Sequence, residues 1–325
     1  MLLLAVVLGV AWFAPSDSFL IVPDEATALA PLVRVEGERN SDDEGGIFFV
    51  DVLVRKASLA EEQIAALRPD GADAVPAHAI VPEGSSFQER REQNRRAMDR
   101  SQEIAAAVAL RELGHEVGSD PNGSLVVAVA EDAPATGKLE PGEVIVAVDG
   151  TAVATPDDLR RLIGRHEVGD TVRLSVREGD ETRTVEVGTI ASPDDPEQPI
   201  VGIQVEQFAD IDVPLDVEFD LGNVGGPSAG LAFALDLVEE LRGDVDRGNL
   251  VVATGELQLD GTVSPVGGLK QKTIGAKRAG ADVFLVPAGD NAAEARRHAD
   301  GMRIIAVESF QQALRELATI GESDN

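Results

Sequence analysis

The sequence of 325 residues contains no cysteine, no tyrosine, one tryptophan and only four histidines. Without cysteine, the chain has no disulfide framework, thiol nucleophile, CxxC redox pair or thiolate zinc site. Aromatic residues make up 3% of the chain, too few for the stacking platforms that bind single-stranded nucleic acid. The chain has 58 acidic and 28 basic residues, which gives a net charge of −30. Such a surface repels phosphates, so nucleic acid is not an expected partner.

Two further absences argue against a metal site and a nucleotide-binding site. The histidines lie far apart in the sequence and in no spacing typical of metal ligands: His78, His115, His166 and His298. We therefore expect no metal and no other cofactor. The phosphate-binding pattern G-x-x-x-x-G-K-[ST] is also absent, because Gly137-Lys138 lacks the upstream glycine and the following serine or threonine. No nucleotide is expected as a partner.

The amino terminus is apolar. Residues 1–14 read MLLLAVVLGVAWFA, residues 15–18 interrupt this run, and Phe19–Val22 resume it. The run is short for a membrane span, which needs about 20 residues, and no basic residue precedes Arg34. We expect residues 1–24 to be an uncleaved signal anchor. It would be a single pass through the cell membrane, with the rest of the chain extracytoplasmic; a buried amino-terminal helix is the alternative.

Residues 25–114 mix strand-like and helix-like patterns. Ile47–Val54 is rich in β-branched and aromatic residues and predicts a strand. Ser58 followed by Glu61 has the spacing of a capping box. Residues 86–113 predict a long helix with a polar first half and an Ala-rich second half. We expect these residues to form a small α/β layer against the next unit.

Residues 115–190 predict a compact β domain. A strand at 125–129 precedes a strand–turn–strand segment with its turn at Asp149-Gly150, and Thr155-Pro-Asp-Asp158 begins a helix. A closing hairpin covers 172–187. The pattern APA…L.PGE.I.AVDG..V.T..DL resembles the PDZ domains of bacterial proteases.

A PDZ domain binds an extended peptide by adding it as a strand to an open sheet edge. By this resemblance we expect the peptide at the loop and strand formed by Gly123, Ser124, Leu125 and Val126. The Gly-Leu-Gly-Phe of the best-known PDZ domains is absent from this loop. The alternative is a small β domain that serves only as a spacer.

A Pro- and Asp-rich segment at 191–199 predicts a linker, and the last domain covers 200–325. Within it, Gly222-Asn-Val-Gly-Gly-Pro-Ser-Ala-Gly230 leads into a helical pattern. Ser228 therefore lies at a glycine-rich turn that enters a helix. The free N–H groups and positive potential of a helix amino end suit an oxyanion. Taken alone, the same segment also fits an ordinary helix start.

A second motif follows, TGE…G.V.P.GGLK.K…A…GA…..VP, between Thr254 and Pro287. Together with Gly-Pro-Ser-Ala-Gly it closely resembles the proteolytic domain of Lon-type serine proteases. The order of signal anchor, PDZ domain and Lon-type domain is similar to the ATP-independent, membrane-anchored PDZ–Lon proteins of bacteria.

The resemblance implies a role for each matching residue. Ser228 matches the catalytic serine, Lys270 the catalytic lysine, and Thr254 the threonine that hydrogen-bonds the lysine. The backbone turn of Gly226, Pro227 and Ala229 would hold the oxyanion. The neighbouring Lys272 and Lys277 are expected on the helix surface. Gly225-Gly226 replace an acidic residue found in some members, and the family also implies a homo-oligomer.

The sequence thus predicts an α+β multidomain protein. Its expected function is ATP-independent serine endopeptidase activity with a Ser–Lys dyad. The expected substrates are unstructured segments of proteins or peptides outside the cytoplasmic membrane, delivered by the PDZ domain. One alternative is a non-catalytic PDZ/Lon-like scaffold. A second is a protein that cleaves only its own linker or anchor.

Overall fold

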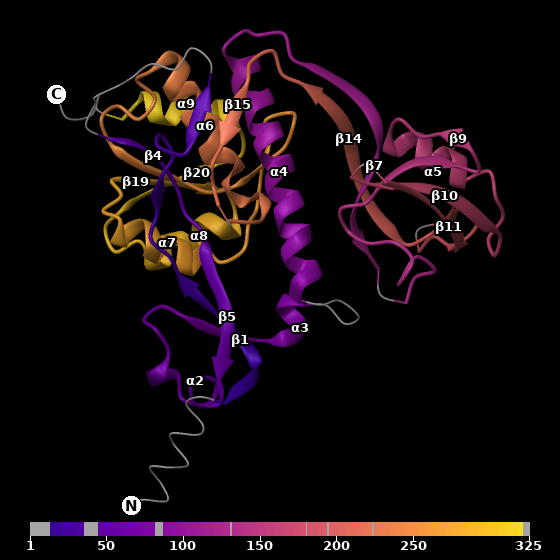
Figure 1. Ribbon diagram of the computed structural model, residues 1–325, viewed down its shortest axis with the longest axis horizontal. Helices are drawn as coiled ribbons and strands as arrows, with labels where there is room; N and C mark the ends of the chain where they lie inside the picture. Colours follow the sequence, from indigo (N-terminus) through magenta and orange to yellow (C-terminus); the bar gives the residue numbers. More distant parts are fainter. Residues whose placement is uncertain are drawn as a thin grey trace, which may run out of the picture. The chain divides into compact units, whose positions relative to one another are not determined.

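The computed structural model (Figure 1) describes residues 14–35, 45–81, 87–130, 132–179, 181–193, 195–222 and 224–320. The first apolar run of the expected anchor, residues 1–13, lies outside the described residues. Contacts divide the chain into two compact units. Unit 1 joins Met1–Val117 to Val213–Asn325, and unit 2 is Gly118–Asp212. The region 25–114 thus belongs to the unit that holds Ser228, not to a layer of the PDZ-like unit.

Unit 1 is built on a five-stranded sheet of order β2-β4-β16-β19-β20. Four of its strands are parallel, and β2 is antiparallel to β4. Their bounds are β2 (Thr27–Ala28), β4 (Gly46–Phe49), β16 (Leu250–Ala253), β19 (Val283–Pro287) and β20 (Arg303–Val307). Continuous apolar runs form such strands because parallel sheets are covered on both faces.

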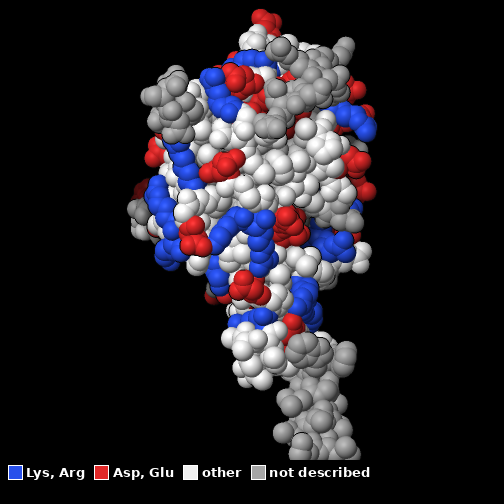
Figure 2. Space-filling view, turned by 90° about the vertical axis from the view of Figure 1, so that its left-hand side faces the viewer, with Lys and Arg blue, Asp and Glu red and all other residues white. Residues whose placement is uncertain are grey.

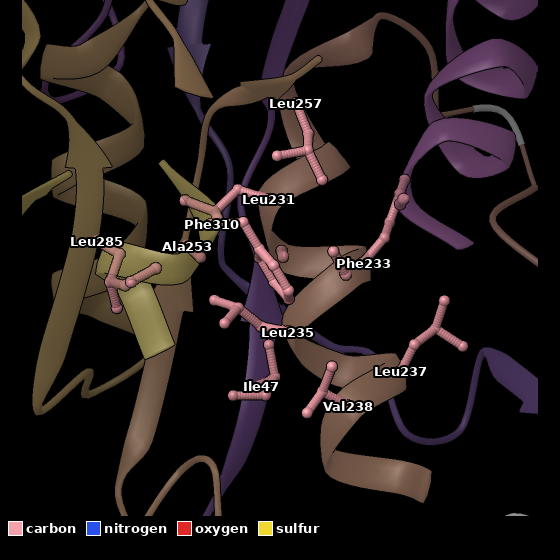
Figure 3. Packing of buried hydrophobic residues seen from close by; sticks show 14 of the residues in the cluster. Ile47, Leu231, Phe233, Leu235, Leu237, Val238, Ala253, Leu257, Leu285 and Phe310 are labelled. Carbon is pink, nitrogen blue, oxygen red and sulfur yellow. The ribbon is translucent and has the colours of Figure 1, made fainter. Parts of the chain in front are cut away.

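Helices cover the two faces of this sheet, and each face has its own core. On one face lie α4, α6 and α9, packed on alternate strand residues such as Ile47, Ala253 and Leu285 (Figure 3). On the other lie α7 and α8, packed on the intervening residues such as Val252 and Phe284. The helices are α4 (Phe87–Glu112), α6 (Gly230–Arg242), α7 (Leu269–Arg278), α8 (Asp290–His298) and α9 (Phe310–Ala318). The long helix expected at 86–113 is confirmed as α4.

The second apolar stretch of the expected anchor, Phe19–Val22, is a strand and not part of a membrane segment. It lies in β1 (Pro15–Pro23), the central strand of a three-stranded sheet between β5 (Val52–Ser58) and β6 (Asp73–Pro76). Phe19 and Leu20 are buried there. An apolar run can be buried by strand pairing as well as by lipid, which is why composition did not separate the two. No helix among the described residues is long and apolar enough to cross a membrane.

The strand expected over Ile47–Val54 is split at Val50 and Asp51. Its first half is β4, and its second half begins β5 (Val52–Ser58), which pairs with β1 in a different sheet. The capping box at Ser58 and Glu61 is confirmed at the start of α2 (Leu59–Gln63). The remaining small elements of unit 1 are α2 (Leu59–Gln63), η1 (Ala65–Leu67), β6 (Asp73–Pro76), α3 (Ala77–Ile80), β3 (Val33–Val35), β15 (Val217–Phe219), η2 (Pro227–Ala229), β17 (Glu256–Leu257) and β18 (Val263–Ser264).

In its described residues, unit 2 is built on a six-stranded antiparallel sheet and the helix α5. The strand order is β11-β10-β8-β7-β14, and β9 pairs with β8. The expected turn at Asp149-Gly150 and the capping box at Thr155 are both present. The bounds are β7 (Gly118–Val129), β8 (Val144–Val148), β9 (Thr151–Ala152), α5 (Pro156–Ile163), β10 (Thr171–Glu178), β11 (Glu181–Gly188) and β14 (Ile203–Asp212).

The segment expected as a linker does not end this unit. Strands β12 (Ile190–Ala191) and β13 (Pro199–Ile200) pair around it. Beyond it, β14 pairs with β7 along nearly its whole length. Strand β14 was expected in the carboxy-terminal domain, but its contacts place it in unit 2.

Charges of both signs are mixed on the face of the molecule shown in Figure 2. Lys and Arg side chains lie among Asp and Glu, with uncharged areas between them. The net charge of −30 is therefore not displayed on this face as one continuous acidic field.

Candidate active site

Ser228 lies in the short 3-10 turn η2, which runs directly into α6. Helix α4 fixes this turn by two hydrogen bonds. The Gly226 amide donates to the Asn94 carbonyl at 2.7 Å, and the Ser101 hydroxyl donates to the Pro227 carbonyl at 3.1 Å. Gly226 has φ +94°, a backbone conformation that glycine adopts without strain.

The glycine after the turn, Gly230, is required by close packing. A Cβ at this position would lie 2.8 Å from Ser101 Oγ and 3.1 Å from Leu257 Cβ. Glycine therefore lets α4 and β17 approach the start of α6. The glycines of the Gly-Pro-Ser-Ala-Gly motif thus shape the turn that presents Ser228.

A buried lysine faces Ser228, and it is Lys272. Its Nζ donates to Ser228 Oγ at 2.6 Å and to Thr254 Oγ1 at 2.9 Å. Thr254 follows β16, and its hydroxyl donates in turn to the Ser228 carbonyl at 3.0 Å. The Gly255 amide donates to the same carbonyl at 2.9 Å. The three side chains thus form one hydrogen-bonded cluster.

The prediction that Lys270 lies at this site is wrong. Lys270 Nζ instead donates to Asp73 Oδ1 at 2.7 Å, on the other side of α7. Helix α7 buries Leu269, Lys272, Thr273 and Ala276, which occupy the i, i+3, i+4 and i+7 positions of one face, together with Gln271 and Gly275. This helical periodicity was readable from the sequence and would have selected Lys272. The prediction that Lys272 lies on the surface is wrong for the same reason.

Burial determines the electrostatics of Lys272, which is 2% exposed. Loss of solvation lowers the pKa of Lys272 from 10.5 to about 8, while the charge of Asp51 acts to raise it. Burial also raises the pKa of the Asp51 carboxyl, with a further increase from Asp24, whereas Lys272 lowers it. A lysine with a pKa near 8 has a substantial neutral fraction in mildly alkaline solution, as a general base requires.

The loop before α7 is held by Asn291, a residue to which the sequence assigned no role. The Asn291 side chain accepts a hydrogen bond from the Val266 amide at 2.8 Å and donates one to the Val266 carbonyl at 3.0 Å. Gly268, at φ +73°, then begins the helix. These contacts fix the start of the helix that carries Lys272.

The expected oxyanion turn of Gly226, Pro227 and Ala229 is only in part available. The Gly226 amide is bonded to Asn94, and proline has no N–H. The backbone groups that remain as candidates are the amides of Ser228 itself and of Ala229.

The expected peptide edge in unit 2 is also wrong. Gly123, Ser124, Leu125 and Val126 lie in β7, which is paired with β8 on one side and with β14 on the other. Ser124 and Val126 are fully buried. A strand that is paired on both sides has no free row of backbone N–H and C=O groups with which a peptide could pair. The edge strand on this side of the sheet is β14.

Among the described residues there is no group of three or more His, Asp or Glu side chains placed to hold a metal ion. The hydrogen-bonded cluster itself consists of the Ser228 hydroxyl, the Lys272 amine and the Thr254 hydroxyl.

Two segments of the chain match known protein families. Residues 197–319 match the family model of the Lon protease (S16) C-terminal proteolytic domain, and residues 107–189 match that of the PDZ domain. Lon protease 2 of Bacillus subtilis is 37% identical over 94 residues, which cover 29% of this chain and 17% of that protein. Lon protease 1 of Sorangium cellulosum is 40% identical over 92 residues, 28% of this chain and 11% of that protein.

Among solved structures, the PDZ domain of an SdrC-like protein from Listeria monocytogenes is 28% identical. The match covers 26% of the present chain and 87% of the Listeria chain, with a TM-score of 0.24. The chain spans less than a fifth of the length of the two Lon proteases. It thus combines a PDZ domain with a Lon-type (S16) C-terminal proteolytic domain.

Proposed function

We propose that this chain is a serine endopeptidase in which Ser228 is the nucleophile and Lys272 is the general base. The observation that carries the proposal is the distance of 2.6 Å between Lys272 Nζ and Ser228 Oγ, for a lysine that is almost completely buried. A serine hydroxyl is a weak nucleophile and needs an adjacent base. A scaffold without catalysis would have no reason to bear the cost of burying an amine against a serine.

The reaction follows from these positions. Neutral Lys272 takes the proton of the Ser228 hydroxyl as Oγ attacks the peptide carbonyl carbon. The resulting ammonium gives the proton to the leaving amine, and the acyl-enzyme is hydrolysed by water that the same lysine activates. Thr254 orients the lysine, because its hydroxyl accepts from Nζ and donates to the Ser228 carbonyl. The amides of Ser228 and Ala229 are the proposed donors to the oxyanion.

Cleavage by this chain is proposed to need no nucleotide. The 325 residues contain no phosphate-binding G-x-x-x-x-G-K-[ST] pattern, and a protease without an unfolding motor acts on segments that are already unstructured. The proposed substrates are therefore unfolded proteins and exposed tails. The apolar run of residues 1–14 supports a location at the cell membrane, with the proteolytic domain outside the cytoplasm.

The PDZ unit is proposed to bind substrate at the outer edge of β14. An edge strand presents unpaired N–H and C=O groups to which an extended peptide can add. Helix α5 lies against both β7 and β14, so a peptide on this edge would run beside the helix. From Asp212, at the end of β14, the chain reaches Ser228 in 16 residues.

The test is cleavage of an unfolded reporter protein by the full chain in detergent, with and without ATP. A fragment starting at residue 25 is unsuitable, because it would lack β1 and with it the central strand of a sheet. We expect wild type to cut at the same rate in both conditions and Ser228→Ala to be inactive. An ATP requirement, or cleavage by Ser228→Ala, would contradict the proposal.

Amino-terminal sequencing of the purified chain distinguishes general from self-directed proteolysis. A protein that cuts only itself would yield a new terminus within residues 15–45 or 191–199 in wild type, absent in Ser228→Ala, and would leave the reporter intact. We expect the reporter to be cut.

A further inference from the structure

Asp51 and Thr254 both follow strands of the five-stranded sheet of unit 1. Strands β4 and β16 are parallel neighbours, with Phe49 opposite Ala253. Thr254 is the first residue after β16, and Asp51 is the second after β4. Because parallel strands end at the same edge of a sheet, the topology brings Asp51 to the side on which Lys272 meets Thr254.

The residues on either side of Asp51 contact α7, the helix that carries Lys272. Val50 Cγ2 lies 3.0 Å from the position that a Cβ on Gly275 would occupy, and Val52 Cγ1 lies 3.1 Å from the equivalent position on Gly268. Gly268 caps α7, and Gly275 lies about two turns further along. The segment of residues 50–52 therefore spans the part of the helix that contains Lys272.

The hydrogen-bond partners of the Lys272 amine are neutral. They are two hydroxyls, those of Ser228 and Thr254. Among the described residues, Asp51 is the charge that opposes the effect of burial on the pKa of Lys272. Asp24, whose backbone carbonyl packs against Gly275, acts on Asp51 as a like charge.

We propose that Asp51 is a positioning residue of the Ser228–Lys272 site, with its carboxylate stabilising the ammonium that Lys272 becomes when it takes the serine proton. The proposal rests on the proposed function. The proton moves from Ser228 Oγ to Lys272 Nζ and then to the leaving amine, while Asp51 neither gains nor loses one. Its charge makes the lysine a stronger base than burial alone would leave it.

The direct test is the titration of the Lys272 amine by NMR in the full chain with isotope-labelled lysine. The chain has only five lysines, at 56, 138, 270, 272 and 277, so the Lys272 signal is assigned by its loss in Lys272→Met. We expect Asp51→Asn to lower the Lys272 midpoint by at least about half a pH unit. Asp51→Glu, which keeps the charge, should bring it back towards the wild-type value.

Asp73→Asn is the matched control. Asp73 is also an acidic residue in contact with α7, but its carboxylate is bonded to Lys270 and Gln271. We expect its loss to leave the Lys272 midpoint in place. An unchanged midpoint in Asp51→Asn, or an equal shift in Asp73→Asn, would overturn the role of Asp51.

A reciprocal measurement does not depend on the folding of the Asp51 variants. Lys272→Met should raise the midpoint of the labelled Asp51 carboxyl, because it removes the positive charge that now lowers it. Absence of that shift overturns the Asp51 proposal even when Lys272→Met has lost cleavage of the reporter. Retained cleavage in Lys272→Met would instead overturn the proposed function, so the two failures are distinguishable.

Discussion

At the scale of single residues, the central feature is an amine held out of water. Lys272 is 2% exposed, and its hydrogen-bond partners are the hydroxyls of Ser228 and Thr254. Burial of an amine disfavours its charged form. The lowered pKa that makes the lysine a usable base therefore also reduces the stability of the folded protein at pH values below that pKa.

The pH dependence of cleavage follows from this. Lys272 must be neutral to accept the serine proton, and its pKa is about 8. We predict that kcat/KM rises with pH through a single ionisation near pH 8 and falls about tenfold for each pH unit below it. The measurement is a pH profile on a peptide substrate without ionisable groups in this range. A profile that is flat from pH 6 to 9 would be incompatible with a lysine base.

The stability of the folded chain should show the same ionisation with a defined sign. Between about pH 8 and 10.5 the unfolded chain binds more protons at Lys272 than the folded chain, so this residue makes stability rise with pH there. Below that range the cost of the buried charge is on the order of 3 kcal/mol. We predict that Lys272→Met raises the free energy of unfolding at pH 7 by about 1–3 kcal/mol. Denaturant unfolding of both proteins at pH 7 measures this, and a clearly less stable variant would refute it.

At the scale of secondary structure elements, the amino-terminal segments of unit 1 hold the helix that carries the base. Lys270 and Gln271 bond to Asp73, and Arg278 bonds to the Asp70 carbonyl at 3.1 Å. Helix α7 approaches the backbone of Asp24 closely at Gly275. A Cβ there would lie 1.9 Å from the Asp24 carbonyl oxygen.

We therefore predict that Gly275→Ala destabilises the protein by about 2–4 kcal/mol and lowers activity, because α7 must shift away from residue 24. Gly267→Ala is the control, since a Cβ at this exposed glycine meets nothing within 4 Å. Thermal unfolding and reporter cleavage are measured on both. Equal melting temperatures for the two variants would show that α7 is not held at this point.

The elements that the sequence predicted well are those decided by local interactions. The capping boxes at Ser58 and Thr155 and the turn at Asp149-Gly150 are present as expected, because each depends on residues a few positions apart. Strand β14 could not be assigned to its sheet in the same way, because its pairing with β7 joins residues about 80 positions apart. The strand nature of Phe19–Val22 likewise depends on distant partners in β5 and β6.

Of the three side chains in the hydrogen-bonded cluster, two were predicted correctly from the sequence. The sequence motifs identified Ser228 and Thr254, and the structure brings these two together. It replaces Lys270 by Lys272 because α7 presents Lys272 to Ser228 in the protein interior and Lys270 to Asp73. Asp51, for which we propose a positioning role, was not singled out in the sequence, because its placement depends on the parallel pairing of β4 with β16.

At the scale of the whole molecule, one chain combines a unit proposed to bind peptides with one proposed to cut them. Gly202, directly before β14, offers a way to separate the two. It has φ +80°, and a Cβ there would lie 2.3 Å from Ala133 Cβ. Its carbonyl also accepts a hydrogen bond from the Ala130 amide. A larger residue must displace the start of the edge strand.

We predict that Gly202→Val raises KM for an unfolded protein about tenfold and leaves the cleavage of a short peptide unchanged. Gly188→Ala is the control on the opposite edge strand, where a Cβ makes only an ordinary contact at 3.7 Å. Steady-state kinetics on both substrates measure the effect. A Gly202→Val protein that cuts the long substrate with unchanged KM would remove the PDZ unit from substrate capture.

The central claim is that Lys272, and not Lys270, is the base that activates Ser228. The two lysines are two residues apart on one helix, so Lys272→Ala and Lys270→Ala form a matched pair. Cleavage of the unfolded reporter by the full chain at pH 8.5 is the most direct measurement. We predict a loss of at least about 10³-fold in kcat/KM for Lys272→Ala and a change within about threefold for Lys270→Ala, whose ion pair is partly exposed. The reverse order, or equal activity of the two variants, would contradict the account.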